Sequence, residues 1–151
     1  DDMVYQTGAR IEIDQYINTR IEVELAFVLG KSLSGPNCTI TDVLDATAYV
    51  IPALEILSSN IEMDGRTIVD TISDNAAMGA MVVGGTPTKP SDVDLRWVAA
   101  LLYRNETIEE TGVAAAVLGH PAAGVHWLAN KIHAHGDSMA AGEIALATSS
   151  K

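Results

Sequence analysis

Three glutamates are the residues of this sequence whose type and spacing could support chemistry. Glu22 and Glu24 lie two residues apart in the stretch 20–29, and Glu55 stands alone in the apolar run 50–57. Alternate residues of a β-strand point to the same face with Cα atoms roughly 6–7 Å apart, so Glu22 and Glu24 would lie side by side. A carboxylate within an apolar run is costly unless a positive charge meets it.

Two interpretations of these glutamates stay open on the residues alone. Glu22 and Glu24 could belong to a strand face that simply contacts water, or the three carboxylates could share one cation. Ala26 and Val28 continue the same face, which is therefore not polar along its whole length. Carboxylate oxygens without a cluster of thiols or imidazoles favour a hard divalent cation such as Mg²⁺ or Mn²⁺. On the second interpretation, Glu22, Glu24 and Glu55 are metal ligands.

The elements that must position these glutamates can be predicted from apolar periodicity and capping residues. Every odd position from Ile21 to Leu29 is apolar, which predicts a half-buried strand. The stretch 49–57 also predicts a strand, and because Pro52 cannot donate a hydrogen bond we expect it to be an edge strand or to carry a bulge. Further expected elements are a short strand near 11–13, a helix from Thr39 to about Ala48, a hairpin of 94–103 with 107–111, and a helix from His120 to Gly136.

The segment 70–75 places polar side chains directly before the small residues 76–83. Asp and Asn in such a segment can form a turn by hydrogen bonding to the nearby backbone. Alternatively, Ser73, Asp74 and Asn75 could line a pocket whose floor is the small-residue segment. Under this second interpretation these three are the predicted substrate-binding residues.

Length and charge limit the classes of function. The chain has 151 residues, 48% of them apolar, which fits one domain with a sizeable core. Its net charge of −11 disfavours binding to nucleic acid and to anionic membrane surfaces. The single cysteine excludes an internal disulfide and suits the reducing cytoplasm. No run of about 18 apolar residues is present, so we expect no membrane span.

Several longer motifs extend along nearly the whole chain and carry a resemblance. They include Glu22-Val-Glu-Leu-Ala-Phe-Val-Leu29, Gly35-Pro-Asn-Cys-Thr39, Tyr49-Val-Ile-Pro-Ala-Leu-Glu-Ile56, Asp70-Thr-Ile-Ser-Asp-Asn-Ala-Ala77, Asp94-Leu-Arg-Trp97 and His120-Pro-Ala122. As a set, these motifs resemble the hydratase and decarboxylase branch of the fumarylacetoacetate hydrolase superfamily.

The resemblance implies a fold, a cofactor and an activity. The implied fold is α+β and strand-rich, a mixed β-sandwich or roll with flanking helices, in which Glu22, Glu24 and Glu55 hold Mg²⁺ or Mn²⁺. The implied activity is the metal-dependent addition of water to a 2-hydroxydienoate or 2-oxo-enoate dicarboxylate in aromatic meta-cleavage catabolism, by a cytoplasmic homo-oligomer. A 4-oxalocrotonate decarboxylase, a 2-hydroxypenta-2,4-dienoate hydratase and a non-catalytic metal-binding domain stay open as alternatives.

Two further expectations follow from the resemblance, and a third follows from the charge of the three carboxylates. Family members extend beyond both ends of this sequence, so residues 1–151 are expected to be a fragment of a single catalytic-type domain. The groups that transfer protons are expected outside this span, and no catalytic acid or base is assigned within it. Three carboxylates around a divalent ion leave a charge near −1, so a dianionic substrate is expected to need another cation, for which Arg104 is a candidate.

Overall fold

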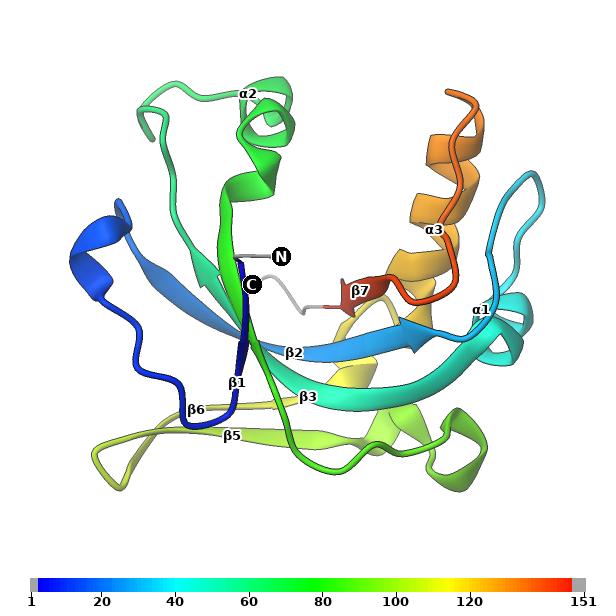
Figure 1. Cartoon of the computed structure of the whole chain (residues 1–151), viewed down its shortest axis with the longest axis horizontal. Coiled ribbons are helices and arrows are strands. Elements are labelled where there is room, and N and C mark those ends of the chain that lie inside the picture. Colours follow the sequence, from blue (N-terminus) through cyan, green and yellow to red (C-terminus); the bar gives the residue numbers. More distant parts are fainter. Residues whose placement is uncertain (1–2, 148–151) are drawn as a thin grey trace.

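The computed structural model describes residues 3–147 and combines a five-stranded sheet, a two-stranded hairpin and three α-helices within that range (Figure 1). The strands are β1 (Val4–Gln6), β2 (Arg20–Leu29), β3 (Thr47–Leu57), β4 (Met78–Val83), β5 (Ala99–Arg104), β6 (Thr107–Val113) and β7 (Ile144–Ala147). The α-helices are α1 (Ile40–Ala46), α2 (Ile68–Ser73) and α3 (Ala122–His133). Short 3-10 turns are η1 (Ile13–Gln15), η2 (Asn75–Ala77), η3 (Pro90–Asp92), η4 (Leu95–Trp97) and η5 (Ala114–Ala116). This strand-rich mixture confirms the predicted α+β class.

The five-stranded sheet is centred on the long antiparallel pair of β2 and β3. The strand order is β1-β4-β3-β2-β7, with β1 parallel to β4 and every other pair antiparallel. In Figure 1, β2 and β3 run across the view while β1 and β4 stand almost upright, as expected of a strongly twisted sheet. The prediction that 20–29 forms a strand is confirmed over its full length.

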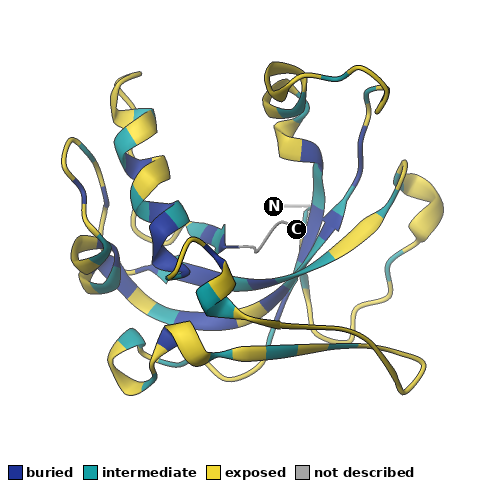
Figure 2. Ribbon diagram, turned by 180° about the vertical axis from the view of Figure 1, so that it is seen from behind, coloured by how far each residue is buried: buried dark blue, intermediate teal, exposed yellow. Residues whose placement is uncertain are grey.

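The odd-numbered face of β2 carries the larger hydrophobic core. Phe27 and Leu29 are fully buried there against Val43 of α1 and Val125 of α3. Figure 2 shows buried residues along the middle of the sheet and along the faces of α1 and α3 that cover it. Burying a side chain of this size stabilises the fold by roughly 1.5–3 kcal/mol. The apolar alternation therefore makes the odd-numbered face of β2 pack against α1 and α3, and the even-numbered face with Glu22 and Glu24 turns away from them.

A second, smaller cluster covers part of the opposite face of the sheet. It consists of Ala26 from β2, Ile51 and Ala53 from β3, and Met81 and Val83 from β4. All five are buried, although their side chains are mostly small. The even-numbered face of β2 is thus apolar at its carboxyl-terminal half, as Ala26 indicates, and carries its charged residues only at the other half.

Helix α1 begins where its capping residues predict. Thr39 Oγ1 accepts a hydrogen bond from Asp42 N at 3.2 Å, and the Asp42 carboxylate accepts one from Thr39 N at 2.8 Å. This reciprocal capping box satisfies two backbone N–H groups that have no partner inside the helix. The helix ends at Ala46, slightly before the expected Ala48, and β3 follows without a loop.

The expectation of an edge strand at 49–57 is wrong, because β3 lies between β2 and β4. Pro52 is tolerated there because the β3–β4 ladder ends at the pair Ala53–Val83 and does not include the neighbouring Pro52. The missing N–H of Pro52 therefore faces a point beyond β4, where its carbonyl accepts a hydrogen bond from Gly84 N at 3.3 Å. A register shift in this ladder does occur, between Ile56 and Leu57.

Other elements differ from the expectations in detail. The strand expected near 11–13 is absent from the described residues, which instead form η1 there and a short strand, β1, earlier in the chain. The segment 94–103 begins as η4 because the Asp94 carboxylate accepts a hydrogen bond from Arg96 N at 3.2 Å, and it becomes strand β5 only afterwards. The hairpin of β5 and β6 is confirmed. No helix among residues 3–147 is long and apolar enough to cross a membrane.

Candidate metal centre

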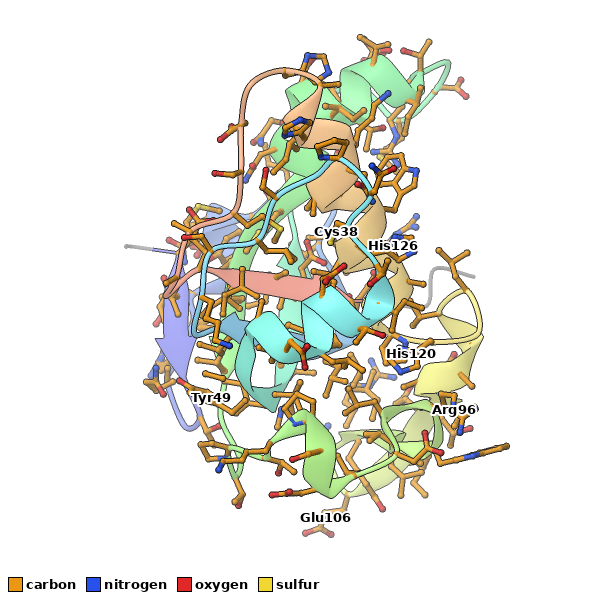
Figure 3. All side chains as sticks on the ribbon, turned by 90° about the vertical axis from the view of Figure 1, so that its right-hand side faces the viewer. Cys38, Tyr49, Arg96, Glu106, His120 and His126 are labelled. Atoms are coloured by element: carbon orange, nitrogen blue, oxygen red, sulfur yellow. The ribbon has the colours of Figure 1, made fainter. Side chains whose placement is uncertain are left out.

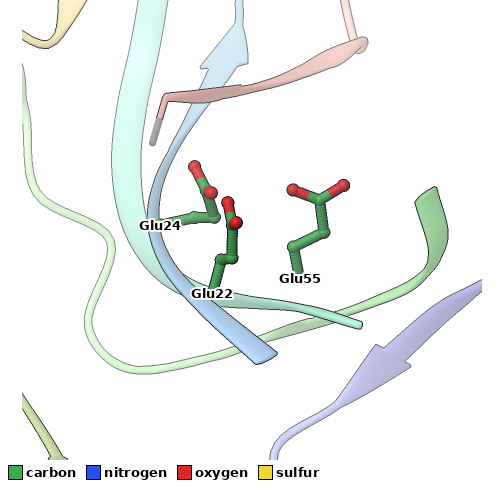
Figure 4. A group of neighbouring side chains, drawn as sticks. All are labelled: Glu22, Glu24 and Glu55. Atoms are coloured by element: carbon green, nitrogen blue, oxygen red, sulfur yellow. The ribbon is translucent and has the colours of Figure 1, made fainter. Parts of the chain in front are cut away.

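Two neighbouring strands bring the three predicted glutamates together on one face of the sheet. Glu22 of β2 is directly opposite Glu55 of β3 in the antiparallel ladder, and Glu24 follows two residues along the same face. One carboxylate oxygen from each side chain lies within 4.8 Å of one from each of the others. Figure 4 shows the three side chains rising in the same direction from the two strands. The sheet register, rather than the sequence spacing, makes this a three-carboxylate cluster.

The cluster is electrostatically costly without a cation. Residues directly opposite in an antiparallel pair have Cβ atoms about 4.5–5.5 Å apart, and like charges at such positions destabilise a sheet. Glu24 is only 4% exposed, and Glu22 and Glu55 are half-buried. Burial, followed by the charge of Glu22, raises the pKa of the Glu55 carboxyl above its ordinary value. A divalent ion between the carboxylates would offset both the cost of burial and the repulsion.

The donor set fits a hard divalent ion. Oxygen ligands of a metal with metal–oxygen distances of roughly 2.0–2.1 Å stand about 3–4 Å apart, and the oxygens of this cluster lie within 4.8 Å of one another. Glu22, Glu24 and Glu55 offer only carboxylate oxygens, which suit Mg²⁺, Mn²⁺ or Ca²⁺ better than softer metals. They are the one group of potential ligands of this kind among the described residues.

The register shift next to Glu55 affects the shape of this site. It falls between Ile56 and Leu57, immediately after the glutamate, where β3 opposes β4. The pairs Ile56–Ala80 and Leu57–Met78 leave Gly79 of β4 as the extra residue, so this bulge bends β4, the strand beside Glu55. In β3 itself the extra residue is Ala48, opposite the step from Val28 to Leu29, rather than a residue near Pro52.

The predicted substrate-binding residues form a short turn between α2 and β4. Ser73 ends α2 and is exposed, Asp74 follows it, and exposed Asn75 begins η2. The Asp74 carboxylate accepts hydrogen bonds from Asn60 N at 2.8 Å and from Asn60 Nδ2 at 3.0 Å. Asn75 Nδ2 donates to Met78 O at 3.3 Å. These bonds connect the turn to the segment that follows β3, and the assignment to substrate binding stays a prediction.

The backbone after Asp74 is unusual. Asn75, Ala76 and Ala77 have φ angles of 52°, 55° and 63°, in the left-handed region that costs a residue with a side chain roughly 1–3 kcal/mol. Ala77 O accepts a hydrogen bond from Ser58 N at 2.7 Å, which holds this strained run against the end of β3. Sequence reasoning missed the strain because two of the three residues are alanines, which carry no turn signal.

The other ionisable groups lie elsewhere. Arg104, the candidate partner for a second substrate carboxylate, is at the exposed tip of the β5–β6 hairpin, where its Nη2 contacts Glu109 Oε1 at 2.9 Å. His120 lines a surface cavity of about 300 Å³ together with Asp94 and Arg96, on the α1 side of the molecule (Figure 3). Burial, followed by the charge of Arg96, lowers the pKa of His120. The three glutamates do not line this cavity.

Comparison with known proteins shows what the chain is similar to. No family model matches it. It is 55% identical to the 2-oxo-hept-4-ene-1,7-dioate hydratase of Escherichia coli over 97% of its own length and 57% of that protein. It is 41% identical to the 2-hydroxyhexa-2,4-dienoate hydratase of Comamonas testosteroni, over 99% of the chain and 57% of the relative. The chain thus spans little more than half the length of these relatives.

Solved structures agree with the sequence comparison. The 4-oxalocrotonate decarboxylase from Pseudomonas putida G7, complexed with magnesium and adipate, superposes with a TM-score of 0.90 at 30% identity, over 97% of this chain and 59% of that one. A putative fumarylacetoacetate isomerase/hydrolase from Oleispira antarctica shares the fold alone, with a TM-score of 0.63 at 18% identity over 97% of this chain and 62% of that one. Over nearly its whole length the chain is therefore similar in sequence to named hydratases and in sequence and fold to a 4-oxalocrotonate decarboxylase, and it has a fumarylacetoacetate hydrolase-like fold.

Proposed function

We propose that this chain provides the metal- and substrate-binding part of a hydratase for 2-oxohept-4-ene-1,7-dioate. The observation that carries the proposal is the cluster of Glu22, Glu24 and Glu55, formed by two paired strands in a chain 55% identical to a hydratase of that name. The proposed reaction begins with a 2-hydroxydienoate, which ketonises to the conjugated enone. Water then adds at C4 and gives a 4-hydroxy-2-oxo dioate.

The proposed cofactor is Mg²⁺, with Mn²⁺ as a substitute, held by the three glutamates. When bound, the ion supplies a Lewis acid for the carboxylate and keto oxygens of a 2-oxo acid. The chain's own contribution is to fix the three carboxylates on a rigid sheet, so that little reorganisation accompanies the reaction. Magnesium in the solved 4-oxalocrotonate decarboxylase supports this choice of cofactor.

The described residues divide the work around this centre. Buried Ala26 and Ala53 form a dry surface beside the glutamates, which limits the access of water from that direction. We assign Ser73, Asp74 and Asn75 to the substrate side of the site, because their turn is held against the end of β3 by the Asn60 and Ser58 contacts. The groups that move protons at carbon are proposed to lie outside residues 1–151.

The assembly and the compartment are also proposals. We propose a cytoplasmic homo-oligomer that acts on a small 2-oxo acid and binds neither nucleic acid nor membrane. The net charge of −11 and the single buried cysteine, Cys38, support this setting.

A sister activity on the same centre is the second candidate, because the fold matches a decarboxylase complexed with adipate at a TM-score of 0.90. The test is to supply 2-oxohept-4-ene-1,7-dioate, 4-oxalocrotonate and 2-hydroxypenta-2,4-dienoate in turn to the metal-loaded full-length protein. Hydration of the seven-carbon dioate at the highest kcat/KM supports the proposal. Faster release of CO₂ from 4-oxalocrotonate would assign the decarboxylase instead, and no turnover with any of the three would leave a metal-binding domain.

A further inference from the structure

Arg66 differs from every other basic residue that the structure describes. Among the lysines and arginines of residues 3–147 it is the one that is not exposed. Its Nη1 donates to Ser59 Oγ at 3.5 Å, a long contact, and this is its only hydrogen bond with the described residues. A guanidinium has five N–H donors, so most of those of Arg66 remain available to another acceptor.

Arg66 forms no ion pair within 4.0 Å with an acidic side chain of the described residues. The three ion pairs within 4.0 Å among the described residues use Arg10, Arg96 and Arg104, all exposed. The chain has 20 acidic and 9 basic residues, so acids to pair with are plentiful. A partly buried guanidinium without a carboxylate partner is costly by itself and suits recognition of a carboxylate supplied from outside.

The contact with Ser59 places Arg66 at the same end of the sheet as the carboxylate cluster. Ser59 is 5% exposed and is fixed by hydrogen bonds from its N to Ile17 O at 2.9 Å and from its Oγ to Ile61 O at 3.1 Å. It follows Glu55 by four residues, so their Cα atoms are at most about 13 Å apart. Figure 1 shows this segment leaving the end of β3 and rising towards α2.

In the opposite direction from the glutamates, the described strands offer no cation to a second carboxylate. Along that side of the sheet, β2 continues with Ala26 and Val28, and β3 with Ala53 and Ile51. A carboxylate directed there would meet these apolar side chains and, further along, a cavity of about 290 Å³ whose polar side chains, Gln6 and Tyr49, carry no positive charge. A dicarboxylate bound at the cluster by its 2-oxo acid end should therefore extend towards Ser59 and Arg66.

We propose that Arg66 binds the distal carboxylate of the substrate, and that it makes this site selective for 2-oxo dicarboxylates over 2-oxo monocarboxylates. The inference rests on the proposed function, because it takes the 2-oxo acid end to be held at the glutamate cluster. Arg66 takes the role for which Arg104 was the candidate, because Arg104 is paired with Glu109 at the hairpin tip. Ser59 positions the guanidinium and leaves its other N–H groups available to the substrate.

The test compares two keto acids that differ only at the far end. The full-length protein is loaded with Mn²⁺ and titrated by calorimetry with 2-oxoheptanedioate and with 2-oxoheptanoate. The wild type should bind the dioate more tightly. Loss of one charge-assisted hydrogen-bonding partner corresponds to roughly a 10- to 100-fold loss of affinity, so Arg66→Met should weaken dioate binding by that factor and leave the monoacid nearly unchanged.

Two variants separate recognition from loop stability. Arg66→Lys keeps the charge without the planar fork, so it should recover part of the dioate preference. Arg104→Met removes an equal charge at the hairpin tip and should leave both affinities unchanged. If Arg66→Met weakens both keto acids by the same factor, or neither, Arg66 does not read the distal carboxylate. If the wild type binds neither keto acid in a metal-dependent manner, the proposed function fails together with this inference.

Discussion

Replacing Glu55 by glutamine should change the stability of this protein in opposite directions with and without metal. Glu55 carries a half-buried carboxylate directly opposite Glu22, with oxygens of both side chains within 4.8 Å of each other. At an effective dielectric constant of about 20, two unit charges at that distance repel by about 3 kcal/mol. Partial exposure and salt reduce this value, and we expect removal of the Glu55 charge to stabilise the metal-free protein by roughly 1–2 kcal/mol.

The expected shift can be measured by thermal unfolding. For a domain of this size 1 kcal/mol corresponds to roughly 2–4 °C, so Glu55→Gln should melt about 2–8 °C above the wild type in a chelator. With Mn²⁺ at about 100 times its Kd, binding should stabilise the wild type by about 2.7 kcal/mol. The variant lacks one ligand charge and should gain much less, so the order of the two melting temperatures should reverse.

A matched control and a clear refutation accompany this experiment. Glu110→Gln removes the same charge from exposed strand β6 and should change neither melting temperature by more than about 1 °C. If Glu55→Gln melts below the wild type in the chelator, the carboxylates do not repel as the geometry indicates. If Mn²⁺ stabilises the variant as much as the wild type, Glu55 is not a ligand.

Three further predictions concern the capping boxes and the turn after α2. Thr39→Ala should destabilise the protein by about 0.5–2 kcal/mol, because α1 carries fully buried Val43. Thr67→Ala should barely change the free energy of global unfolding, because α2 buries no residue, and urea titration of both variants measures the difference. Hydrogen bonds from Thr39 lower the pKa of Asp42, so the ionised carboxylate stabilises the folded protein fully above the pKa of the unfolded state and loses this effect as the pH falls through the pKa of the folded state. The difference in stability between the wild type and Asp42→Asn should therefore vanish in acid, and a difference that is constant with pH would contradict the prediction. Asn75→Gly should raise KM or lower kcat with little change in melting temperature, because glycine adopts the φ of 52° at this position without strain, and normal kinetics in a merely unstable variant would identify the segment as a turn only.

The sequence predicted the strands of the site better than their arrangement. The alternation from Ile21 to Leu29 predicted β2 because burial of every second residue against α1 and α3 decides the face. The sequence could not predict that β3 lies in the middle of the sheet. That position is possible because the ladder with β4 ends at Ala53, so the missing N–H of Pro52 breaks no hydrogen bond of that ladder. Local propensity carries no information about where a neighbouring strand stops.

Residues without a local signal were also the ones that the sequence analysis missed. The polar segment 70–75 forms the end of α2, because Thr67 and Asp70 build a capping box that was not anticipated. Arg66 precedes that box in a polar loop, and nothing in its neighbours indicates that Ser59 will hold it. Its partial burial depends on contacts between loop segments, which periodicity cannot describe.

The pairing of Glu22 with Glu55 follows from the core on the other face of the sheet. Phe27 is opposite Val50, and both are buried in the cluster with α1 and α3. A slip of one residue in β2 would turn Phe27 to the other face and bring Glu22 and Glu24 into that core, at a cost of several kcal/mol for the desolvated carboxylates. The hydrophobic packing that stabilises the sheet therefore also fixes the register that sets three carboxylates side by side. The repulsion between them is tolerated because the core opposes the slip, and the same register preorganises the three carboxylates for the divalent cation that we propose.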